Sequence, residues 1–184
     1  DRSMKPELER LKAQKGIHKT VRALICGIPN VGKSALINSM SGGTSAKTGN
    51  KPGVTRGTQL IRVTPYLEML DTPGILWPKL ENPIFARHLA YVGSIRAEVM
   101  DTEELACHFI TEMVDKFPGC LLDRYKLTPS DLELPAYELL ETIARARGLL
   151  RGGGVCDTER AAQMVLTEFR SGKLGRITLE APEE

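Results

Sequence analysis

The chain has 184 residues, of which 41% are hydrophobic and 26% are charged. This length and composition suit a soluble globular protein with one large or two small domains. No apolar run reaches membrane-spanning length, no secretory signal stands at the start, and the four cysteines are too scattered for a zinc site or a disulfide framework. We therefore expect a cytoplasmic protein with no membrane partner.

Charge is distributed unevenly behind a net value of +2. Residues 1–60 carry 11 Lys and Arg against 3 Asp and Glu, whereas residues 61–141 carry 7 against 14. A basic first third favours a polyanionic partner such as RNA, although nucleotide binding accounts for part of this charge and a solvated basic face is the plain alternative. Because the chain begins at Asp1 rather than at Met, we expect a fragment or a chain whose beginning is missing.

A phosphate-binding loop is the most specific pattern in the sequence. A short helix is predicted at residues 3–15 and a buried strand at residues 21–26, and residues 27–34 then read G-I-P-N-V-G-K-S. This matches the P-loop pattern G-x-x-x-x-G-K-[ST], and a helix is predicted to follow at residues 34–40. Strand, glycine loop and helix are the context that the pattern needs, so the sequence predicts binding of a nucleoside triphosphate.

The chemistry of this loop explains its spacing. Two glycines let successive backbone N–H groups point at a phosphate chain, and the following helix adds its positive end. Lys33 is expected to reach the β- and γ-phosphates, and the Ser34 hydroxyl is expected to bind Mg²⁺. The expected nucleotide-binding residues of the loop are Gly27, Asn30, Val31, Gly32, Lys33, Ser34 and Ala35.

A second motif, D-T-P-G at residues 71–74, follows an apolar strand in the manner of a Walker B segment. Asp71 is expected to hold Mg²⁺ through a water, and the Gly74 N–H to bind the γ-phosphate. Between the two motifs, Thr55 is placed to complete the metal shell only when the γ-phosphate is present. The expected catalytic residues are Lys33, Thr55, Asp71 and Gly74, and the expected metal ligands are Ser34, Thr55 and Asp71.

The usual guanine-reading element is missing after this motif. A conventionally ordered GTPase carries N-K-x-D there, but residues 75–184 contain no such element, and Asn50-Lys51 lacks the carboxylate that must follow. Base recognition is therefore either absent or located upstream of residue 1. The residue after Gly74 is Ile75, where Ras-like enzymes keep a water-orienting Gln, so hydrolysis should be slow and should depend on another group or a partner.

Helical patterns dominate the second half of the chain. Strands are predicted at residues 58–63 and 67–70, and helices at residues 83–95, 101–116, 136–147 and 158–170. The first of these helices is expected to close the nucleotide-binding core. We therefore expect an α/β P-loop domain at residues 1–98 and an all-α domain at residues 99–184.

Basic side chains are frequent in the predicted helical domain, namely Arg145, Arg147, Arg151, Arg160, Arg170, Lys173 and Arg176. They could form an RNA-facing surface or only solvated helix faces, and the residues favour the two interpretations equally. No aromatic residues are interleaved to stack on bases, so RNA would be bound through phosphate or shape rather than sequence.

The motifs resemble those of the circularly permuted GTPases. The resemblance rests on residues 27–34, 51–55 and 71–78 and on F-R-S-G-K-L-G-R at residues 169–176, and it covers nearly the whole chain from about residue 15. That family places its guanine-binding motifs before the P-loop, which implies a permuted domain whose N-terminal part is missing here. The resemblance also implies GTP and GDP as ligands, the large ribosomal subunit as activator, a C-terminal helical domain that binds ribosomal RNA, and a potassium ion that Asn30 helps to coordinate.

The leading hypothesis is a Mg²⁺-dependent, monomeric GTPase that acts as an assembly factor for the large ribosomal subunit and has no DNA partner. GTP would order the Thr55 loop and Gly74, the ordered state would dock on the immature subunit, and hydrolysis would release it. Two alternatives remain open. One is an ATP-using P-loop enzyme such as a small kinase, and the other is an RNA- or ribosome-binding module without efficient hydrolysis.

Overall fold

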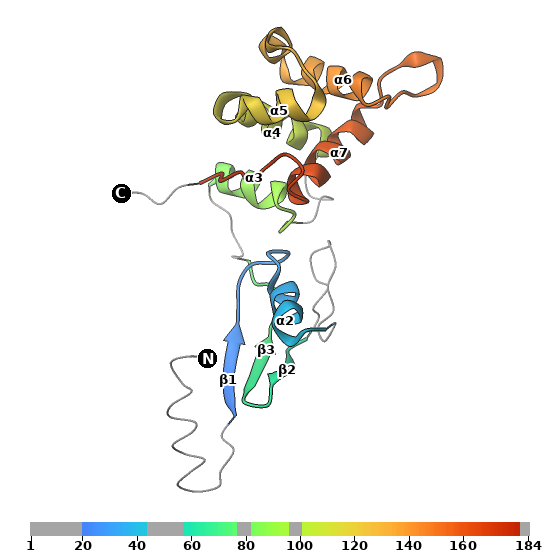
Figure 1. The fold of residues 1–184 in the computed structure, drawn as a ribbon. Helices are drawn as coiled ribbons and strands as arrows, with labels where there is room; N and C mark the ends of the chain where they lie inside the picture. The colour runs from blue at the N-terminus through green and yellow to red at the C-terminus, as the bar shows by residue number, and fades with distance from the viewer. Residues whose placement is uncertain (1–19, 44–56, 77–81, 96–100, 181–184) are drawn as a thin grey trace, which may run out of the picture. The chain divides into compact units, whose positions relative to one another are not determined.

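The computed structural model describes residues 20–43, 57–76, 82–95 and 101–180. The chain divides into two compact units, Asp1–Trp77 and Pro78–Glu184, which we call the first and the second unit (Figure 1). The helix predicted at residues 3–15 and the loop residue Thr55 lie outside the described residues. No helix in the described part of the chain is long and apolar enough to cross a membrane.

The described residues of the first unit form a small mixed sheet and one helix. Its elements are β1 (Val21–Ile25), α2 (Lys33–Ser41), β2 (Gln59–Thr64) and β3 (Leu67–Asp71), which confirms the elements predicted there. The strand order is β1-β3-β2, with β3 parallel to β1 and antiparallel to β2. The parallel register pairs Ile25 at the end of β1 with Asp71 at the end of β3. The P-loop and the D-T-P-G motif therefore begin at the same edge of the sheet.

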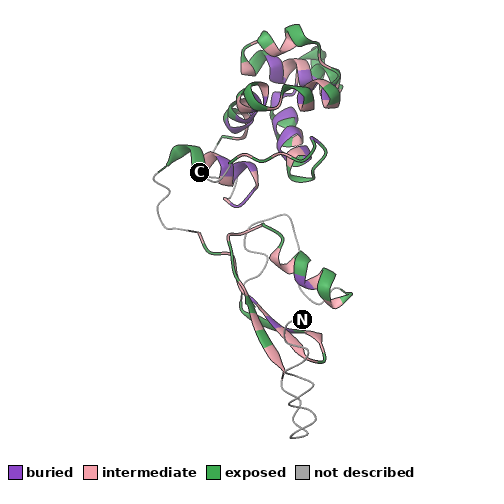
Figure 2. Cartoon of the chain, turned by 60° about the vertical axis from the view of Figure 1, so that its left-hand side comes forward, coloured by how far each residue is buried: buried purple, intermediate pink, exposed green. Residues whose placement is uncertain are grey.

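One face of this sheet is covered and the other is open. Ile37 of α2 is fully buried in a cluster with Met69 and neighbouring strand residues. On the opposite face Leu24, Leu70 and Leu60 stand in register across the three strands. Leu24 and Leu60 remain 62% and 47% exposed, and Figure 2 shows few buried residues in this unit. An α/β sheet with a parallel pair normally has both faces covered, so this face is unfinished in the described residues.

The described residues of the second unit form helices joined by turns, with one isolated β-bridge between Leu150 and Cys156. Its helices are α3 (Pro83–Tyr91), α4 (Thr102–Lys116), α5 (Pro118–Tyr125), α6 (Ala136–Ala146) and α7 (Thr158–Arg170), with short 3-10 turns at Pro129–Glu133 and Gly152–Gly154. Side-chain caps explain where α3, α4 and α7 begin. Asn82, Asp101 and Asp157 each accept hydrogen bonding from backbone N–H groups in the first turn of the helix that follows. Helix α5 was not predicted: Pro118 ends α4 but also suits the first turn of a new helix.

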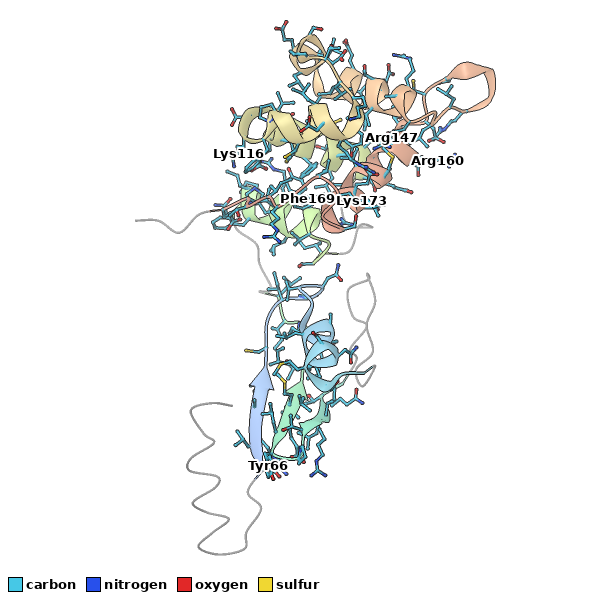
Figure 3. The ribbon with its side chains drawn as sticks, in the orientation of Figure 1. Tyr66, Lys116, Arg147, Arg160, Phe169 and Lys173 are labelled. Carbon is cyan, nitrogen blue, oxygen red and sulfur yellow. The ribbon has the colours of Figure 1, made fainter. Side chains whose placement is uncertain are left out.

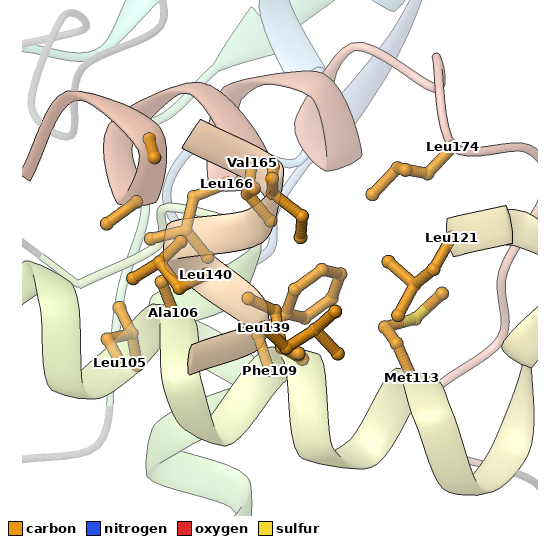
Figure 4. Close-up of a cluster of buried hydrophobic side chains, with 14 of the residues drawn as sticks. Leu105, Ala106, Phe109, Met113, Leu121, Leu139, Leu140, Val165, Leu166 and Leu174 are labelled. Atoms are coloured by element: carbon orange, nitrogen blue, oxygen red, sulfur yellow. The ribbon is translucent and has the colours of Figure 1, made fainter. Parts of the chain in front are cut away.

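Three aromatic rings occupy the centre of the second unit. Phe109 of α4 is completely buried, and its ring lies 5.1 Å from Tyr91 of α3 and 4.8 Å from Phe169 of α7. Buried leucines of α6, Leu139 and Leu140, close the cluster that Figure 4 shows. Leu121 and Tyr125 of α5 are buried in the same cluster, so the core of this unit depends on contacts among five helices.

Helix α3 belongs to this core, which corrects the expectation that it closes the nucleotide-binding domain. Its last residues, Ala90 and Tyr91, are buried in the cluster of the second unit. The guanidinium of Arg170 donates from Nε to the Tyr91 carbonyl at 2.7 Å and from Nη2 to the Ala90 carbonyl at 2.8 Å. A cation on the last carbonyls of a helix is favourable. The compact units therefore meet between residues 77 and 78 rather than at residue 98, and Arg170 serves α3 rather than an RNA-facing surface.

A partly buried ion pair joins α5 to α7. The Glu168 carboxylate is 10% exposed, and both of its oxygens accept hydrogen bonds from the Arg124 guanidinium, one of them at 3.0 Å from Nε. The hydrogen bond from Arg124 holds the pKa of Glu168 below its ordinary value of 4.5 although burial opposes the shift. The folded state therefore binds this proton less tightly than the unfolded chain does.

The second unit should lose stability as the pH falls from about 4.5, the ordinary pKa of a glutamate, through the lower pKa of Glu168 in the folded state. We expect the melting temperature to decrease less steeply between pH 5 and pH 3, roughly, in Glu168→Gln than in the wild type, because the variant lacks this proton uptake. Thermal unfolding followed by circular dichroism checks the slope. Equal acid slopes for the two proteins would contradict the assignment.

Candidate nucleotide-binding site

The loop between β1 and α2 has the backbone that a phosphate-binding loop requires. Gly27, Asn30 and Gly32 have φ values of 150°, 63° and 90°, and the helix begins directly at Lys33. Asn is among the few residues other than Gly that tolerate this left-handed region, so the backbone itself explains Asn30. Gly32 caps α2 without a side-chain hydrogen bond, which leaves the first turn of the helix to bind an anion.

Lys33 folds back over this loop. Its ammonium group donates hydrogen bonds to the Gly27 carbonyl at 3.1 Å and to the Ile28 carbonyl at 2.8 Å. These contacts hold the positive charge at the turn where the nucleotide phosphates are expected. Lys33 thus lies over the predicted loop, and its contact with phosphates stays a prediction.

Ser34 and Asp71 come together although 37 residues separate them. The Ser34 hydroxyl donates to Asp71 Oδ2 at 2.8 Å, and Asp71 is 1% exposed. The other carboxylate oxygen, Oδ1, is buried without a hydrogen-bond partner. An unsatisfied buried carboxylate oxygen is costly, and a hydroxyl beside a carboxylate is a donor set that Mg²⁺ accepts. The residues present therefore fit a magnesium ion.

Gly74 lies directly against the phosphate-binding loop. A Cβ at this position would stand 2.4 Å from both N and Cα of Pro29, and the neighbouring Ile75 N–H donates to the Gly27 carbonyl at 3.2 Å. The Thr72 hydroxyl adds a bond of 2.8 Å to the Ile25 carbonyl at the end of β1. Gly74 has an ordinary φ, so a left-handed backbone is not the reason for a glycine here. The reason is the close approach of two backbone segments, which leaves no room for a Cβ.

Replacement of Gly74 by Ala should push this motif away from the loop, because the backbone atoms of Pro29 cannot swing aside. We expect the first unit to lose about 1–3 kcal/mol of stability and to bind nucleotide more weakly. Thermal unfolding and titration with a fluorescent nucleotide measure the two effects. Gly43→Ala is the matched control, because a Cβ at Gly43 meets no atom within 4 Å. Equal behaviour of the two variants would contradict the packing argument.

Part of the predicted site lies outside the described residues, namely Thr55 and the motif at residues 51–55. The predicted residues that the structure does bring together are Gly27, Lys33, Ser34, Asp71 and Gly74. Sequence reasoning overlooked Thr72 and Pro29, which join the two motifs. The hydroxyl residue inside the D-T-P-G motif was the feature of the sequence that could have predicted the contact made by Thr72.

The predicted basic residues of the second unit have different partners. Arg151 donates to Asp157 at 2.9 Å and to Glu159 at 3.2 Å, so its charge is largely compensated. The Arg147 guanidinium donates to a backbone carbonyl and lies 3.8 Å from Glu168. The proposed RNA-facing set is therefore smaller than the sequence indicates.

The strand, loop and helix, with Lys33 and the Ser34–Asp71 pair at one edge of the sheet, define a P-loop nucleotide-binding protein. The chain belongs to the family described as 50S ribosome-binding GTPase, whose model matches residues 22–144. That match extends from the first unit into the second.

Named relatives are similar to this chain over nearly its whole length. The chain is 43% identical to ribosome biogenesis GTPase A of Bacillus cereus over 98% of its own length and 60% of that protein. It is 34% identical to ribosome biogenesis GTPase A of Thermotoga maritima over 90% of its own length and 58% of that protein. The chain thus spans about 60% of the length of these curated relatives.

Solved structures show the same fold. A GDP-bound structure of TM YlqF superposes with a TM-score of 0.57 at 30% identity and covers 96% of this chain and 67% of that one. A GNP-bound structure of YlqF from T. maritima gives a TM-score of 0.55 at 30% identity, over 96% and 66% of the two chains. These similarities favour the GTPase hypothesis over an ATP-using enzyme and over a binding module.

Proposed function

We propose that this chain is the phosphate-binding part, with a helical C-terminal domain, of a cytoplasmic, circularly permuted GTPase that assists assembly of the large ribosomal subunit. The observation that carries the proposal is the Ser34–Asp71 pair, with its unsatisfied buried oxygen, beside the Lys33 loop. Family membership and the names of the relatives support a ribosomal partner.

The side chains divide the work of binding a triphosphate. Lys33 exchanges its two loop carbonyls for phosphate oxygens, and the N–H groups at the start of α2 bind the phosphate chain. Ser34 and Asp71 would hold Mg²⁺, and the ion would neutralise negative charge on the phosphates. The Gly74 N–H and Thr55 bind at the γ-phosphate side, and their contacts are lost after hydrolysis.

Recognition of guanine requires residues that the chain does not show after residue 75. The open sheet face with Leu24 and Leu60 supports a further part of the α/β domain that packs there. In a circularly permuted protein this part carries the guanine-reading motif ahead of the P-loop. The proposed specificity for GTP therefore belongs to a longer protein.

Hydrolysis by this site needs help from outside. Ile75 is 72% exposed and, with its hydrocarbon side chain, cannot orient a water molecule. We therefore expect slow intrinsic hydrolysis and a large stimulation by the large ribosomal subunit, which would supply or position the missing group.

A potassium ion beside Asn30 is the further cofactor in this proposal. The left-handed backbone of Asn30 already accounts for this residue type, so the potassium contact has to be tested by itself. Hydrolysis rates in matched KCl and NaCl decide the matter. Equal rates in the two salts would remove potassium from the proposal.

The central experiment is a titration of this chain with fluorescent GTP, GDP and ATP in Mg²⁺, with and without purified large ribosomal subunits. We expect EDTA to weaken binding, and the subunits both to tighten GTP binding and to stimulate hydrolysis. The same titration with the longer protein shows whether guanine preference resides in the additional part. Tighter binding of ATP than of GTP by the longer protein, or no effect of the subunits, would contradict the proposed function.

A further inference from the structure

The D-T-P-G segment is attached to the phosphate-binding loop on both sides of its glycine. Residues 72–76 have no regular secondary structure, so their place depends on individual contacts. The Thr72 hydroxyl donates to the Ile25 carbonyl at 2.8 Å. Beyond the glycine, the Ile75 N–H donates to the Gly27 carbonyl at 3.2 Å. Two attachments that enclose a glycine give its backbone N–H a defined direction.

These two hydrogen bonds differ in how a bound nucleotide would affect them. The Gly27 carbonyl also accepts from the Lys33 ammonium at 3.1 Å, and Lys33 is expected to exchange this bond for phosphate oxygens. The Ile75 N–H therefore shares its acceptor with a group that leaves when nucleotide binds. The Ile25 carbonyl takes no part in this exchange, so the Thr72 bond should keep its acceptor throughout.

Thr72 extends the contact between two neighbouring strands. Ile25 and Asp71 are the last pair in the parallel register of β1 and β3. The Thr72 side chain adds one bond between the same two segments, directly beyond that pair. Because threonine is branched at Cβ, few rotations about χ1 are open to it, and its hydroxyl holds the backbone firmly. The bond thus fixes the direction in which the chain leaves Asp71 towards Gly74.

We propose that Thr72 is a positioning residue that sets how strongly the site prefers a nucleoside triphosphate to a diphosphate, which rests on the nucleotide-binding function proposed above. The Gly74 N–H is the group of this segment that is proposed to bind the γ-phosphate, and a diphosphate lacks that phosphate. Without the Thr72 bond the segment takes up several positions, so more order is lost when the γ-phosphate binds. The contacts of the Lys33 loop with the other phosphates do not depend on this segment.

The Thr72 hydroxyl acts through the backbone rather than as a ligand. A hydroxyl has one proton to donate, and Thr72 uses it on the Ile25 carbonyl at the end of β1. A purely structural function would have a different consequence, because a general loss of stability weakens the binding of triphosphate and diphosphate alike. The ratio of the two affinities therefore separates positioning from stability.

The test measures the affinities of the full chain for a fluorescent, non-hydrolysable GTP analogue and for fluorescent GDP in Mg²⁺. Thr72→Val removes the hydroxyl and keeps the branched shape. We expect it to weaken binding of the triphosphate about 3–10-fold, the effect of one hydrogen bond, and binding of GDP less than about twofold. Thr72→Ser keeps the donor, so its ratio of affinities should stay within about twofold of the wild-type ratio.

Thr64→Val is the matched control. Thr64 is also a half-buried threonine of the first unit, and its hydroxyl accepts a hydrogen bond from the Tyr66 N–H at 3.2 Å. It lies at the turn before β3, whereas the D-T-P-G segment follows the other end of that strand. Figure 3 labels Tyr66 at this turn. Any loss of melting temperature in Thr64→Val should leave the ratio of the two affinities unchanged.

Three results would overturn the proposal. They are a triphosphate preference that Thr72→Val retains, equal weakening of both nucleotides in Thr72→Val, and a Thr72→Ser variant that behaves like Thr72→Val. Each of them leaves nucleotide binding by the wild-type phosphate loop intact. Absence of nucleotide binding by the wild type would reject the proposed function as well. The ratio concerns phosphates alone, so the test does not require recognition of guanine.

Discussion

Replacement of Lys33 by Ala is expected to weaken GTP binding by about 100-fold. The ammonium group lies at the turn of the loop, and its loss removes charge-assisted hydrogen bonds to the phosphates that contribute together about 3 kcal/mol. The fold of the first unit should survive, because among the described residues the Lys33 ammonium donates hydrogen bonds only to two loop carbonyls. Titration with fluorescent GTP in Mg²⁺ measures the affinity, and circular dichroism checks the fold.

A charge-matched control separates the site from general electrostatics. Arg22→Ala also removes one positive charge from the first unit, but its side chain is 75% exposed and paired with Glu68 on the open sheet face. This variant should change GTP affinity less than about twofold. Similar losses in Lys33→Ala and Arg22→Ala would mean that nucleotide binds by overall charge and not in the phosphate loop.

Replacement of Phe109 by Ala should destabilise the second unit by about 3–5 kcal/mol. The ring is completely buried and touches Tyr91 and Phe169, so its removal leaves a cavity among three helices. Because the compact units divide between residues 77 and 78, nucleotide binding by the first unit should persist after the second unit has melted. Chemical unfolding of the variant, followed by helical signal and by nucleotide fluorescence, separates the two transitions.

Phe85 provides the control for this prediction. It lies on α3 but is 50% exposed, so Phe85→Ala should cost less than about 1 kcal/mol. A small effect of Phe109→Ala would show that α3, α4 and α7 do not share one core. Loss of nucleotide binding together with the helical signal would show that the two units unfold as one.

The phosphate loop could be predicted because its structure is local. Eight consecutive residues decide where the glycines turn, where α2 begins and where Lys33 stands, and no distant contact is needed for this. The second motif could be located by its strand, but its proximity to Ser34 depends on the parallel pairing of β1 with β3. Hydropathy predicts strands without predicting which strands are neighbours.

The position of α3 shows a different limit. Its pattern of apolar residues was sufficient to predict a helix, but such a pattern shows only which face is buried and not which core receives it. Packing of Tyr91 against Phe109, and the bonds of Arg170 to the end of α3, assign this helix to the second unit. These partners lie 18 and 79 residues away in the chain.

Sequence alone determined that this protein has a triphosphate-binding loop, a carboxylate suited to a metal ion and a mainly helical second half, because spacing within short segments encodes each of them. Tertiary structure alone decided that Ser34 reaches Asp71, that Gly74 must be glycine to lie against Pro29, and that the predicted basic residues Arg151 and Arg170 are already paired. The physical reason is the same in each case. Close packing and hydrogen bonding between distant segments decide whether a charge is paired, buried or open to a ligand.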